Sequence, residues 1–285
     1  MTVPRDAVVT ALVPVRHHRA DFLRAAIGSL LDQSSPSWAA VVVVAPEFED
    51  VVTAALADVV DDPRIRMVPT EGRALAGALN TGMRHATTDF VAILLADDLW
   101  ATDAVAVLER RIREAPDVDF FHSARRVVDE AGRPISSVLP ARPNVTLADF
   151  ASVAPVKHLL CWRRELALSI GGMDESLPPV GPDDFDFPWS MAEHGARFAA
   201  IDECLYVVRD HRAHPRLTID LPRTVHVRTL RRIFRKHGLP RRVARRRIRQ
   251  ARRGYLRQCR YRSHVHRVVA RALRIEPTGR QEVYR

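Results

Sequence analysis

The chain has 285 residues, of which 47% are hydrophobic. This composition supports a sizeable core and excludes a disordered chain, and no apolar run approaches the roughly 20 residues that cross a bilayer. Cys161, Cys204 and Cys259 are odd in number and widely spaced, which predicts free thiols and not a disulfide framework or a zinc site. Because the N-terminal residues lead directly into an apolar strand pattern, we expect no signal peptide and a cytoplasmic protein.

The net charge of +10 is distributed unevenly along the chain. Residues 221–285 contain 22 basic and two acidic side chains, which leaves 22 basic and 32 acidic side chains in residues 1–220. The acidic body would repel a polyanion, so we expect no nucleic acid partner even though arginine-rich helices contact phosphates easily. We expect instead that residues 222–267 meet an anionic membrane surface.

The first 95 residues alternate between apolar strands and amphipathic helices. Short apolar runs typical of buried parallel strands lie at residues 8–15, 38–45, 65–68 and 91–95. Helical spacing of apolar residues lies between them, at residues 21–31, 51–60 and 72–86. This alternation predicts an α/β fold with a parallel, doubly wound sheet.

The rest of the chain continues the α/β pattern and then changes character. Helices are predicted at residues 101–114, 159–171 and 187–195, and strands at residues 118–122, 124–128 and 199–208. From about residue 222 the pattern is helical and cationic. We therefore divide the chain into an α/β domain, residues 1–218, and a basic, all-helical C-terminal extension, residues 219–285.

Two adjacent carboxylates, Asp97 and Asp98, follow the apolar strand at residues 91–95. Ligands of open α/β sheets bind beyond the carboxyl ends of the strands, and Mg²⁺ is usually shared between one or two carboxylates and substrate phosphates. The doublet is therefore either a metal–diphosphate site or a turn or helix cap, a position that Asp also favours.

Three segments together resemble glycosyltransferase family 2, whose members are nucleotide-sugar-dependent enzymes with the GT-A fold. They read VVTALVPVRHHRADFLRAAIGSLLDQS, GRALAGALNTGMRHATTDFVAILLADDLW, and IGGMDESLPPVGPDDFDFPWSMAEHG followed by LYVVRDH. The resemblance covers roughly residues 7–218 and has the family's order and spacing. It implies a Rossmann-like, mostly parallel sheet flanked by helices, and inverting transfer of a sugar from a nucleotide-diphosphate sugar, first of all a UDP-sugar.

The resemblance also implies a divalent metal, Mg²⁺ or Mn²⁺. Asp97 matches the second Asp of the family's D-x-D motif and Asp98 follows it, whereas Leu95 replaces the first Asp. His211 matches a late histidine that approaches the metal or the diphosphate in relatives. Its alternative is a surface histidine in a loop, because imidazole is a borderline ligand for hard cations.

The donor is expected along the carboxyl ends of the first strands. Family residues near the donor correspond to Pro14, Val15, Glu47, Arg73, Asn80, Ala96, Asp97 and Asp98. Glu47 stands where the family has an Asp-rich turn, and it either accepts hydrogen bonds from the base or ribose or is a solvated turn residue. The small residues beside Arg73 either let the backbone approach a ligand or pack a helix closely on the sheet.

Asp183 and Asp184 stand where the family places its Glu-Asp pair, and Asp184 matches the catalytic base. A hydroxyl is a poor nucleophile at neutral pH, so a positioned carboxylate is the expected proton acceptor. The alternative is an N-cap for the helix around Phe187, which Asp184 or Asp186 would supply. Capping explains one Asp before a helix but not three in four residues.

The acceptor remains open between a glycan, a lipid-linked molecule and a small molecule. We expect an enzyme of cell-surface glycan or cell wall biosynthesis, peripheral on the inner face of the membrane if the basic extension binds lipid. The alternatives are a transferase that decorates a small secondary metabolite, such as a nucleoside-type natural product, and a catalytically inactive relative. The replacement of the first D-x-D aspartate by Leu95 motivates the inactive alternative.

Overall fold

The structure, a computed structural model, describes residues 7–16, 19–59, 61–152, 154–177, 183–210 and 223–258. The strands are β1 (Val9–Val15), β2 (Trp38–Val44), β3 (Ile65–Pro69), β4 (Phe90–Ile93), β5 (Leu99–Trp100), β6 (Phe120–Asp129), β7 (Leu160–Arg163) and β8 (Phe198–Asp210). The helices are α1 (Ala20–Leu31), η1 (a short 3-10 helix, Pro46–Phe48), α2 (Glu49–Ala55), α3 (Ala74–His85), α4 (Ala104–Glu114), α5 (Leu147–Phe150), α6 (Arg164–Ser169), α7 (Asp183–Glu193), α8 (Arg223–Lys236) and α9 (Arg241–Gln258).

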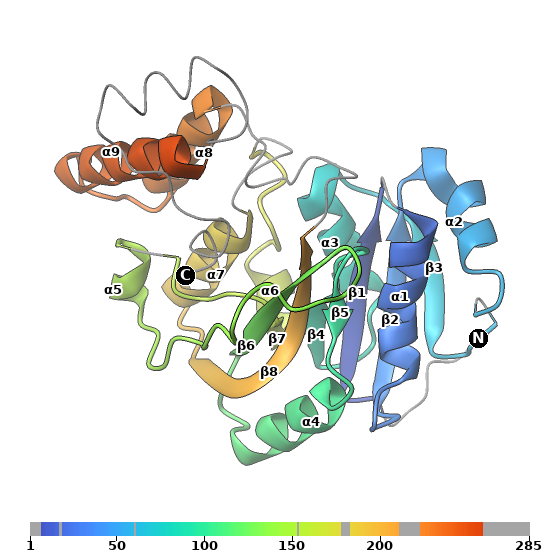
Figure 1. Ribbon diagram of the computed structural model, residues 1–285. Coiled ribbons are helices and arrows are strands. Elements are labelled where there is room, and N and C mark those ends of the chain that lie inside the picture. The colour runs from blue at the N-terminus through green and yellow to red at the C-terminus, as the bar shows by residue number, and fades with distance from the viewer. Residues whose placement is uncertain are drawn as a thin grey trace.

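The eight strands form one sheet in the order β3-β2-β1-β4-β7-β6-β8-β5 (Figure 1). The half from β3 to β4 is entirely parallel, as predicted. In the other half β7 is antiparallel to both β4 and β6, and β5 is antiparallel to β8, whereas β6 and β8 are parallel. The strands β1, β4, β6 and β8 therefore all run in one direction, and their carboxyl ends reach the same edge of the sheet.

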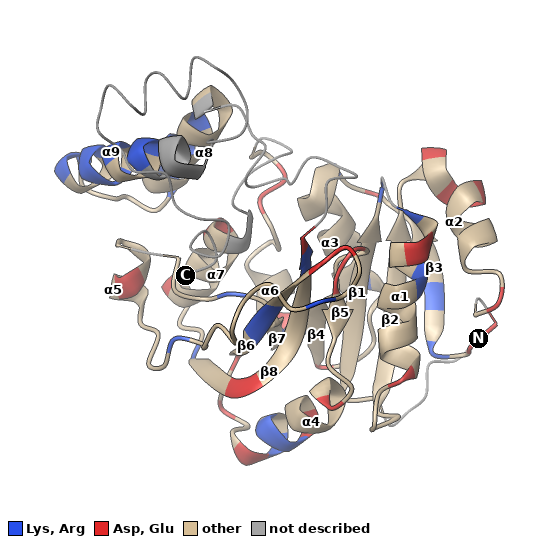
Figure 2. Ribbon diagram, in the orientation of Figure 1, with Lys and Arg blue, Asp and Glu red and all other residues tan. Residues whose placement is uncertain are grey.

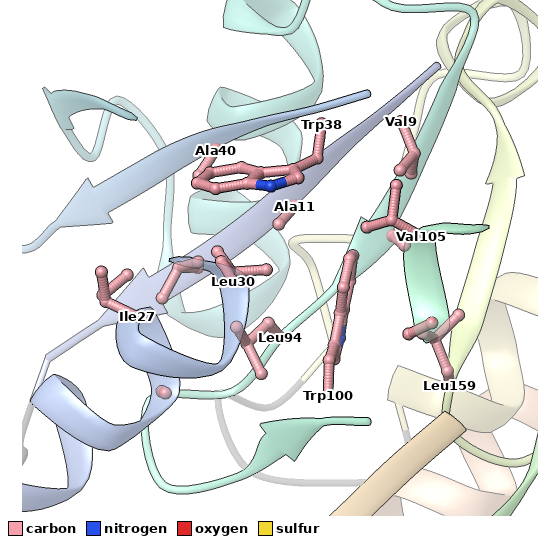
Figure 3. Close-up of a cluster of buried hydrophobic side chains, with 14 of the residues drawn as sticks. Val9, Ala11, Ile27, Leu30, Trp38, Ala40, Leu94, Trp100, Val105 and Leu159 are labelled. Atoms are coloured by element: carbon pink, nitrogen blue, oxygen red, sulfur yellow. The ribbon is translucent and has the colours of Figure 1, made fainter. Parts of the chain in front are cut away.

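Helices cover both faces of the sheet, because alternate residues of each central strand enter opposite cores. On one face, Val9, Ala11 and Val13 of β1 pack with Ile27 and Leu30 of α1 and with residues of α2 and α4 (Figure 3). On the other face, Leu12 and strand residues beside it pack against α3, α6 and α7. A strand buried on both faces reads as a continuous apolar run, which is the pattern found in the sequence.

Several boundaries differ from the sequence predictions. The helix predicted at residues 159–171 is wrong in its first part: residues 160–163 form β7, and only 164–169 are helical. Leu160 and Trp162 enter one core and Cys161 the other, an alternation that a short run of apolar letters hides. The strands predicted at 118–122 and 124–128 are one strand, β6, with register shifts beside Ala124. The helix predicted at 51–60 is α2, which ends at Ala55, and the two-residue strand β5 was not predicted.

The C-terminal extension contains two helices, α8 and α9, as its pattern predicts. Their apolar residues do not form a separate core, because Leu230, Ile233, Phe234 and Ile248 share a cluster with Trp189 and other residues of α5 and α7. The predicted boundary between residues 218 and 219 lies outside the described residues. No helix in the described ranges is both long and apolar enough to cross a membrane, and Cys161 and Cys204 are free thiols.

Candidate functional site

The parallel half of the sheet has a topological switch point between β1 and β4. From β1 the chain proceeds outward to β2 and β3, and it then returns to the other side of β1 with β4. In open α/β sheets, ligands bind in the crevice at the carboxyl ends of the strands beside such a point. Val15 ends β1 at this edge, and the Asp97–Asp98 turn follows β4 there.

Three further predicted donor residues lie at the end of a strand or in a connection that follows one at this edge. Pro14 lies in β1 and pairs with Val43 of β2, one residue before each strand ends. Glu47 lies in η1 directly after β2, and its exposed carboxylate is 3.8 Å from the guanidinium Nε of Arg16. Arg73 is exposed and precedes α3, which follows β3. The edge thus brings together cationic and carboxylate side chains from three separate connections.

The two aspartates of the turn after β4 have different surroundings. Asp98 is buried, with 3% of its surface exposed, and its Oδ1 accepts a 2.8 Å hydrogen bond from the backbone N–H of Arg209. The hydroxyl of Tyr206 hydrogen-bonds to the same carboxylate and lies under the turn, where burial and then the charge of Asp98 hold the pKa of Tyr206 well above its usual range. Asp97 is half-buried. Asp98 therefore anchors the turn, and Asp97 is the member closer to solvent.

Arg209, near the end of β8, holds the acidic turn against two other segments. Its Nε donates to the carbonyl oxygen of Asp97 at 3.1 Å and its Nη1 to that of Glu130 at 3.2 Å. Its guanidinium also lies over the ring of Phe22 in α1, 4.6 Å from the centroid. The end of β8 is thereby fixed beside the Asp97–Asp98 turn, and the chain continues from Asp210 to His211, which lies outside the described residues.

Asn80 was predicted to lie near the donor, but its amide is used within the protein. The side-chain nitrogen donates to the Met173 carbonyl (3.0 Å) and to the Glu175 carboxylate (2.8 Å), and the side-chain oxygen accepts from the Met173 N–H (2.8 Å). Glu175 also accepts from the backbone N–H of Arg73 at 2.8 Å. With 5% of its surface exposed, Asn80 acts as the anchor of the loop at residues 173–177.

The glycines beside Arg73 serve close packing within the protein. A Cβ atom built on Gly72 would lie 2.6 Å from the Cα of Gly77 and 2.7 Å from a carboxylate oxygen of Glu175. Real Cβ atoms essentially never approach so closely, so only glycine lets this loop lie against α3 and Glu175. Of the two interpretations offered by the sequence, the structure supports close packing for this pair.

The helix α7 begins at Asp183, so Asp184 and Asp186 lie in its first turn and not at the N-cap position. The capping alternative therefore does not describe them. Asp186 is instead fully buried and paired: its Oδ2 lies 2.6 Å from the Lys236 ammonium and its Oδ1 3.0 Å from Nε2 of His237. Acidic residues in the first turn also interact favourably with the positive end of the helix dipole.

The residues available for a divalent metal fit a site that substrate phosphates would complete. Carboxylate oxygens are the ligands that Mg²⁺ and Mn²⁺ prefer, and Asp97 supplies one beside the switch point. Within the described ranges, no three His, Cys, Asp or Glu side chains gather as a closed metal site would require. Of the three predicted ligands, the structure joins Asp97 and Asp98 to the end of β8, while His211 lies outside its described part.

Comparison with protein families identifies the chain. The model of glycosyl transferase family 2 matches residues 10–150, which include β1 to α5 and the Asp97–Asp98 turn. The chain contains a glycosyltransferase family 2 domain. The matched segment contains the parallel strands β1 to β4 and the Asp97–Asp98 turn at their carboxyl ends.

Curated relatives of this chain are distant and much longer. The O-antigen biosynthesis protein RfbC of Myxococcus xanthus is 25% identical over 211 residues, which cover 72% of this chain and 16% of that protein. An uncharacterized glycosyltransferase of Rickettsia bellii is 25% identical over 134 residues, which cover 47% of this chain and 19% of that protein. The matched segment thus spans less than a fifth of either relative.

Solved glycosyltransferase structures share the fold. Residues 1–349 of S. aureus TarS in complex with UDP-GlcNAc superimpose with a TM-score of 0.62 at 15% identity, covering 94% of this chain and 76% of that one. The mannosyltransferase PcManGT of Pyrobaculum calidifontis, in complex with GDP-Man and Mn²⁺, gives a TM-score of 0.58 at 19% identity, covering 95% and 80%. These likenesses establish the GT-A fold expected from the sequence.

Sequence reasoning missed the residues that support this site in the family 2 domain. Tyr206 and Arg209 hold the acidic turn, and Glu175 with Lys236 holds the loop after α6 and the start of α7. Arg209 stands in the quoted LYVVRDH segment, so its position beside His211 was a usable signal. Lys236 is the one lysine among the 22 basic residues of the last 65, a difference in residue type that gave no indication of its partners.

Proposed function

We propose that this protein is a glycosyltransferase that moves a sugar from a nucleotide-diphosphate donor to an acceptor hydroxyl with inversion of the anomeric configuration. A UDP-sugar is the first candidate for the donor. The observation that carries the proposal is the contact between the Asp97–Asp98 turn and the end of β8, beside the β1–β4 switch point. That contact brings the predicted metal ligand Asp97 and the segment leading to His211 to the edge where such folds bind nucleotides.

The donor is proposed to lie along this edge. The backbone at Pro14 and Val15 and the carboxylate of Glu47 would contact the base and ribose, because carboxylate oxygens accept hydrogen bonds from both. The exposed guanidinium of Arg73 suits the diphosphate, since arginine forms charge-assisted hydrogen bonds with phosphate oxygens. The backbone at Ala96 would lie beside the diphosphate, before the turn.

A divalent cation, Mg²⁺ or Mn²⁺, is proposed to bind Asp97, with His211 near it. When bound, the cation would stabilise the negative charge that develops on the leaving nucleoside diphosphate. Asp98 would act in the metal site by fixing the turn, because its carboxylate already accepts hydrogen bonds from Arg209 and Tyr206.

Asp184 is proposed as the general base. Its carboxylate would take the proton of the acceptor hydroxyl while the hydroxyl oxygen bonds to the anomeric carbon. The bond from that carbon to the phosphate oxygen would break, and the nucleoside diphosphate would leave with the electron pair. One displacement inverts the anomeric configuration, and removal of a general base typically lowers the rate about 10²–10⁴-fold.

Two measurements test this function. We expect UDP-sugar or GDP-sugar donors to raise the melting temperature only with Mn²⁺ or Mg²⁺ present, and we expect proton NMR of the first product to show the anomer opposite to the donor's.

Asp184→Asn should bind donor normally and turn over at least about a hundredfold more slowly, with Asp183→Asn as the control for the alignment. Retention of configuration, or full turnover by Asp184→Asn, contradicts the mechanism.

The similarity to a protein named for O-antigen biosynthesis supports a glycan acceptor at the cell surface as the first choice. Transfer to a lipid-linked acceptor belongs to the same proposal, and a small secondary metabolite is the alternative. A screen of membrane extracts against small hydroxylated metabolites separates the two. An inactive relative predicts that neither class of acceptor accelerates release of the nucleoside diphosphate.

We also propose that α9 docks the catalytic domain, residues 1–218, on an anionic membrane surface. Its exposed arginines in the part with described side chains are Arg241, Arg242, Arg245, Arg246, Arg249, Arg252 and Arg253 (Figure 2). At 100° per residue they fall within an arc of about 140°, and α9 contains no acidic residue. A single-sign face of this kind complements anionic lipid headgroups, with roughly 1 kcal/mol for each arginine near the surface.

Co-sedimentation with vesicles tests the docking proposal. We expect binding to vesicles that contain phosphatidylglycerol, loss of binding in high salt, and little binding to phosphatidylcholine alone. A variant with Arg242, Arg246 and Arg249 changed to Gln should bind the anionic vesicles more weakly and keep the turnover of soluble substrates. Equal binding to both lipids, or tighter binding to duplex DNA than to anionic vesicles, overturns the proposal.

A further inference from the structure

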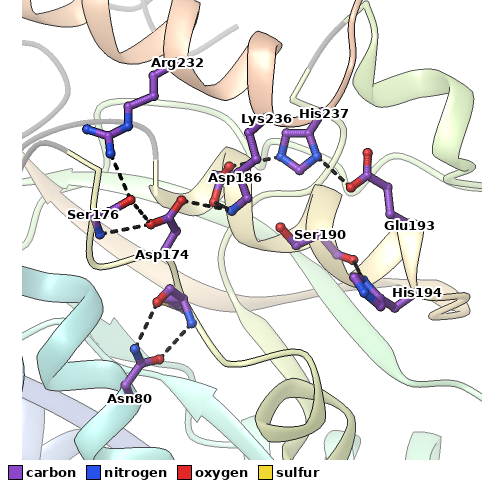
Figure 4. A network of polar contacts seen from close by, with 11 residues as sticks. Asn80, Asp174, Ser176, Asp186, Ser190, Glu193, His194, Arg232, Lys236 and His237 are labelled. Atoms are coloured by element: carbon purple, nitrogen blue, oxygen red, sulfur yellow. Dashed lines mark hydrogen bonds and ion pairs between the residues drawn. The ribbon is translucent and has the colours of Figure 1, made fainter.

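The first turn of α7 is tied to the C-terminal extension by a buried polar network (Figure 4). Asp186 has a side chain that is 1% exposed, and it lies between the Lys236 ammonium at 2.6 Å and the His237 ring at 3.0 Å. The His237 side chain is completely buried, and its other nitrogen, Nδ1, is 2.8 Å from a carboxylate oxygen of Glu193. The network therefore contacts α7 near both of its ends.

Aromatic stacking also holds α7 against His237. The ring of His237 stacks on Trp189 of α7 with centroids 4.2 Å apart and an angle of 5° between the planes. Trp189 belongs to the cluster that also contains Phe234 and Ile233 of α8. The position of α7 about its own axis is thus set by α8 and the residue that follows it, and not only by the sheet.

Lys236 also reaches the loop on the donor side of the site. Its ammonium is 3.3 Å from the Asp174 carboxylate, and Asp174 stands between Met173 and Glu175, which Asn80 and the Arg73 N–H bind. Burial raises the pKa of Asp174, but hydrogen bonds from Ser176 and the charge of Lys236 outweigh it and lower that pKa overall. One cation therefore joins the loop beside Arg73 to the helix that begins with Asp183 and Asp184.

We propose that Lys236 is a positioning residue for sugar transfer, which holds α7, and with it the base Asp184, in register with the donor-side loop. This inference rests on the proposed function, because it assigns Lys236 its role through Asp184. Asp184 lies two residues before Asp186 in the same helical turn, so a rotation of α7 moves both. A displacement of about 1 Å at a catalytic group can cost on the order of a hundredfold in rate.

The test compares Lys236→Met with Arg235→Met, an adjacent exposed cation that makes no ion pair with other described residues. Turnover is measured as release of nucleoside diphosphate from UDP-GlcNAc and from GDP-mannose with water as the acceptor of the sugar, so that no other acceptor needs to be known. We expect Lys236→Met to lower kcat at least tenfold and to change the donor KM less than threefold, because Asn80 and the Arg73 N–H still hold the donor-side loop. Arg235→Met should match the unmodified protein, and Lys236→Arg should recover most of the loss.

Combination with Asp184→Asn separates positioning from a general loss of structure. If Lys236 acts through Asp184, its removal should cost less than threefold in the Asp184→Asn background. A loss that multiplies fully in that background, or a kcat within threefold of normal for Lys236→Met alone, overturns the proposal. A fully active Asp184→Asn protein refutes the base assignment alone and does not depend on Lys236.

A second variant covers the case in which Lys236→Met fails to fold, since it removes a cation from the buried Asp186 carboxylate. Asp186→Asn combined with Lys236→Met leaves no charge at the buried position 186, so we expect folding to be restored and kcat to stay at least tenfold low. Full recovery of kcat in this double variant overturns the positioning role. Circular dichroism and the melting temperature establish that each protein is folded.

Discussion

His122, in β6, gives a stability prediction whose size follows from the structure. The residue is 1% exposed, and neither ring nitrogen has a hydrogen-bond partner among the described residues. Burial lowers the pKa of His122 from 6.5 to about 4. The unfolded chain therefore binds a proton between these pH values that the folded protein does not bind, so stability is complete above pH 6.5 and is lost as the pH falls toward 4.

The magnitude follows from about 1.36 kcal/mol for each unit of pKa difference. From pH 7.5 to pH 5 the folded protein should lose about 2 kcal/mol through His122 alone, and about 3.4 kcal/mol is the limit below pH 4. The perturbation is His122→Leu, which keeps a similar volume and removes both unpartnered nitrogens. At neutral pH we expect this variant to be as stable as the unmodified protein or more stable, because it buries no unsatisfied polar atom.

The assay is urea unfolding of both proteins at pH 7.5, 6 and 5. His226, whose pKa burial also lowers, is present in both proteins, so its contribution cancels in the difference. We expect the free energy of unfolding of His122→Leu to rise by about 2 kcal/mol relative to the unmodified protein between pH 7.5 and 5. Two pH profiles that stay parallel within about 0.5 kcal/mol would refute the reasoning, since 1.36 kcal/mol corresponds to one pKa unit.

Three further predictions concern the site. Asp97→Asn should abolish the effect of Mn²⁺ on the donor-induced melting shift, because a bound cation dominates the local field; an unchanged shift counts against Asp97 as a ligand. Tyr206→Phe should lower the free energy of unfolding by about 1–3 kcal/mol in urea denaturation, since Asp98 and the Leu95 N–H lose a buried partner; no loss would mean that water replaces the hydroxyl. Gly72→Ala should lower the free energy of unfolding by about 1–3 kcal/mol, because the added Cβ overpacks the loop. The control Gly28→Ala, with no atom within 4 Å of its added Cβ, should leave that free energy unchanged or raise it. Equal effects of both changes would contradict the close contact.

The parallel half of the sheet was predictable because its strands are buried on both faces. Such strands carry an uninterrupted apolar run, and the helices between them keep a regular spacing. The sequence also predicted which connections carry charged residues at the carboxyl edge of the sheet, because those residues directly follow the apolar runs that form the strands. The antiparallel strand β7 was not predictable in this way, because Leu160, Cys161 and Trp162 are equally apolar in a helix or a strand.

The division of labour between Asp97 and Asp98 could not be read from the sequence. The two residues are adjacent and chemically identical, and only the positions of Tyr206 and the Arg209 N–H, more than 100 residues later, make Asp98 the anchor. The role of Asn80 as the anchor of the loop at residues 173–177 could not be predicted for a similar reason. A buried amide and an amide that contacts a ligand have the same sequence pattern, and the partners Met173 and Glu175 are distant in the chain.

The partners of Asp186 follow it in the chain by 50 and 51 residues. During synthesis, which proceeds from the N-terminus at about 5–20 residues per second, α7 can form before Lys236 and His237 have left the ribosome. Until then the Asp186 carboxylate has neither partner, and burying it unpaired is costly. The nascent α/β domain is therefore expected to hold α7 loosely and to complete its core only when the start of the basic extension arrives, several seconds later. The order of translation thus makes the extension the last step in assembling the helix that carries the proposed base.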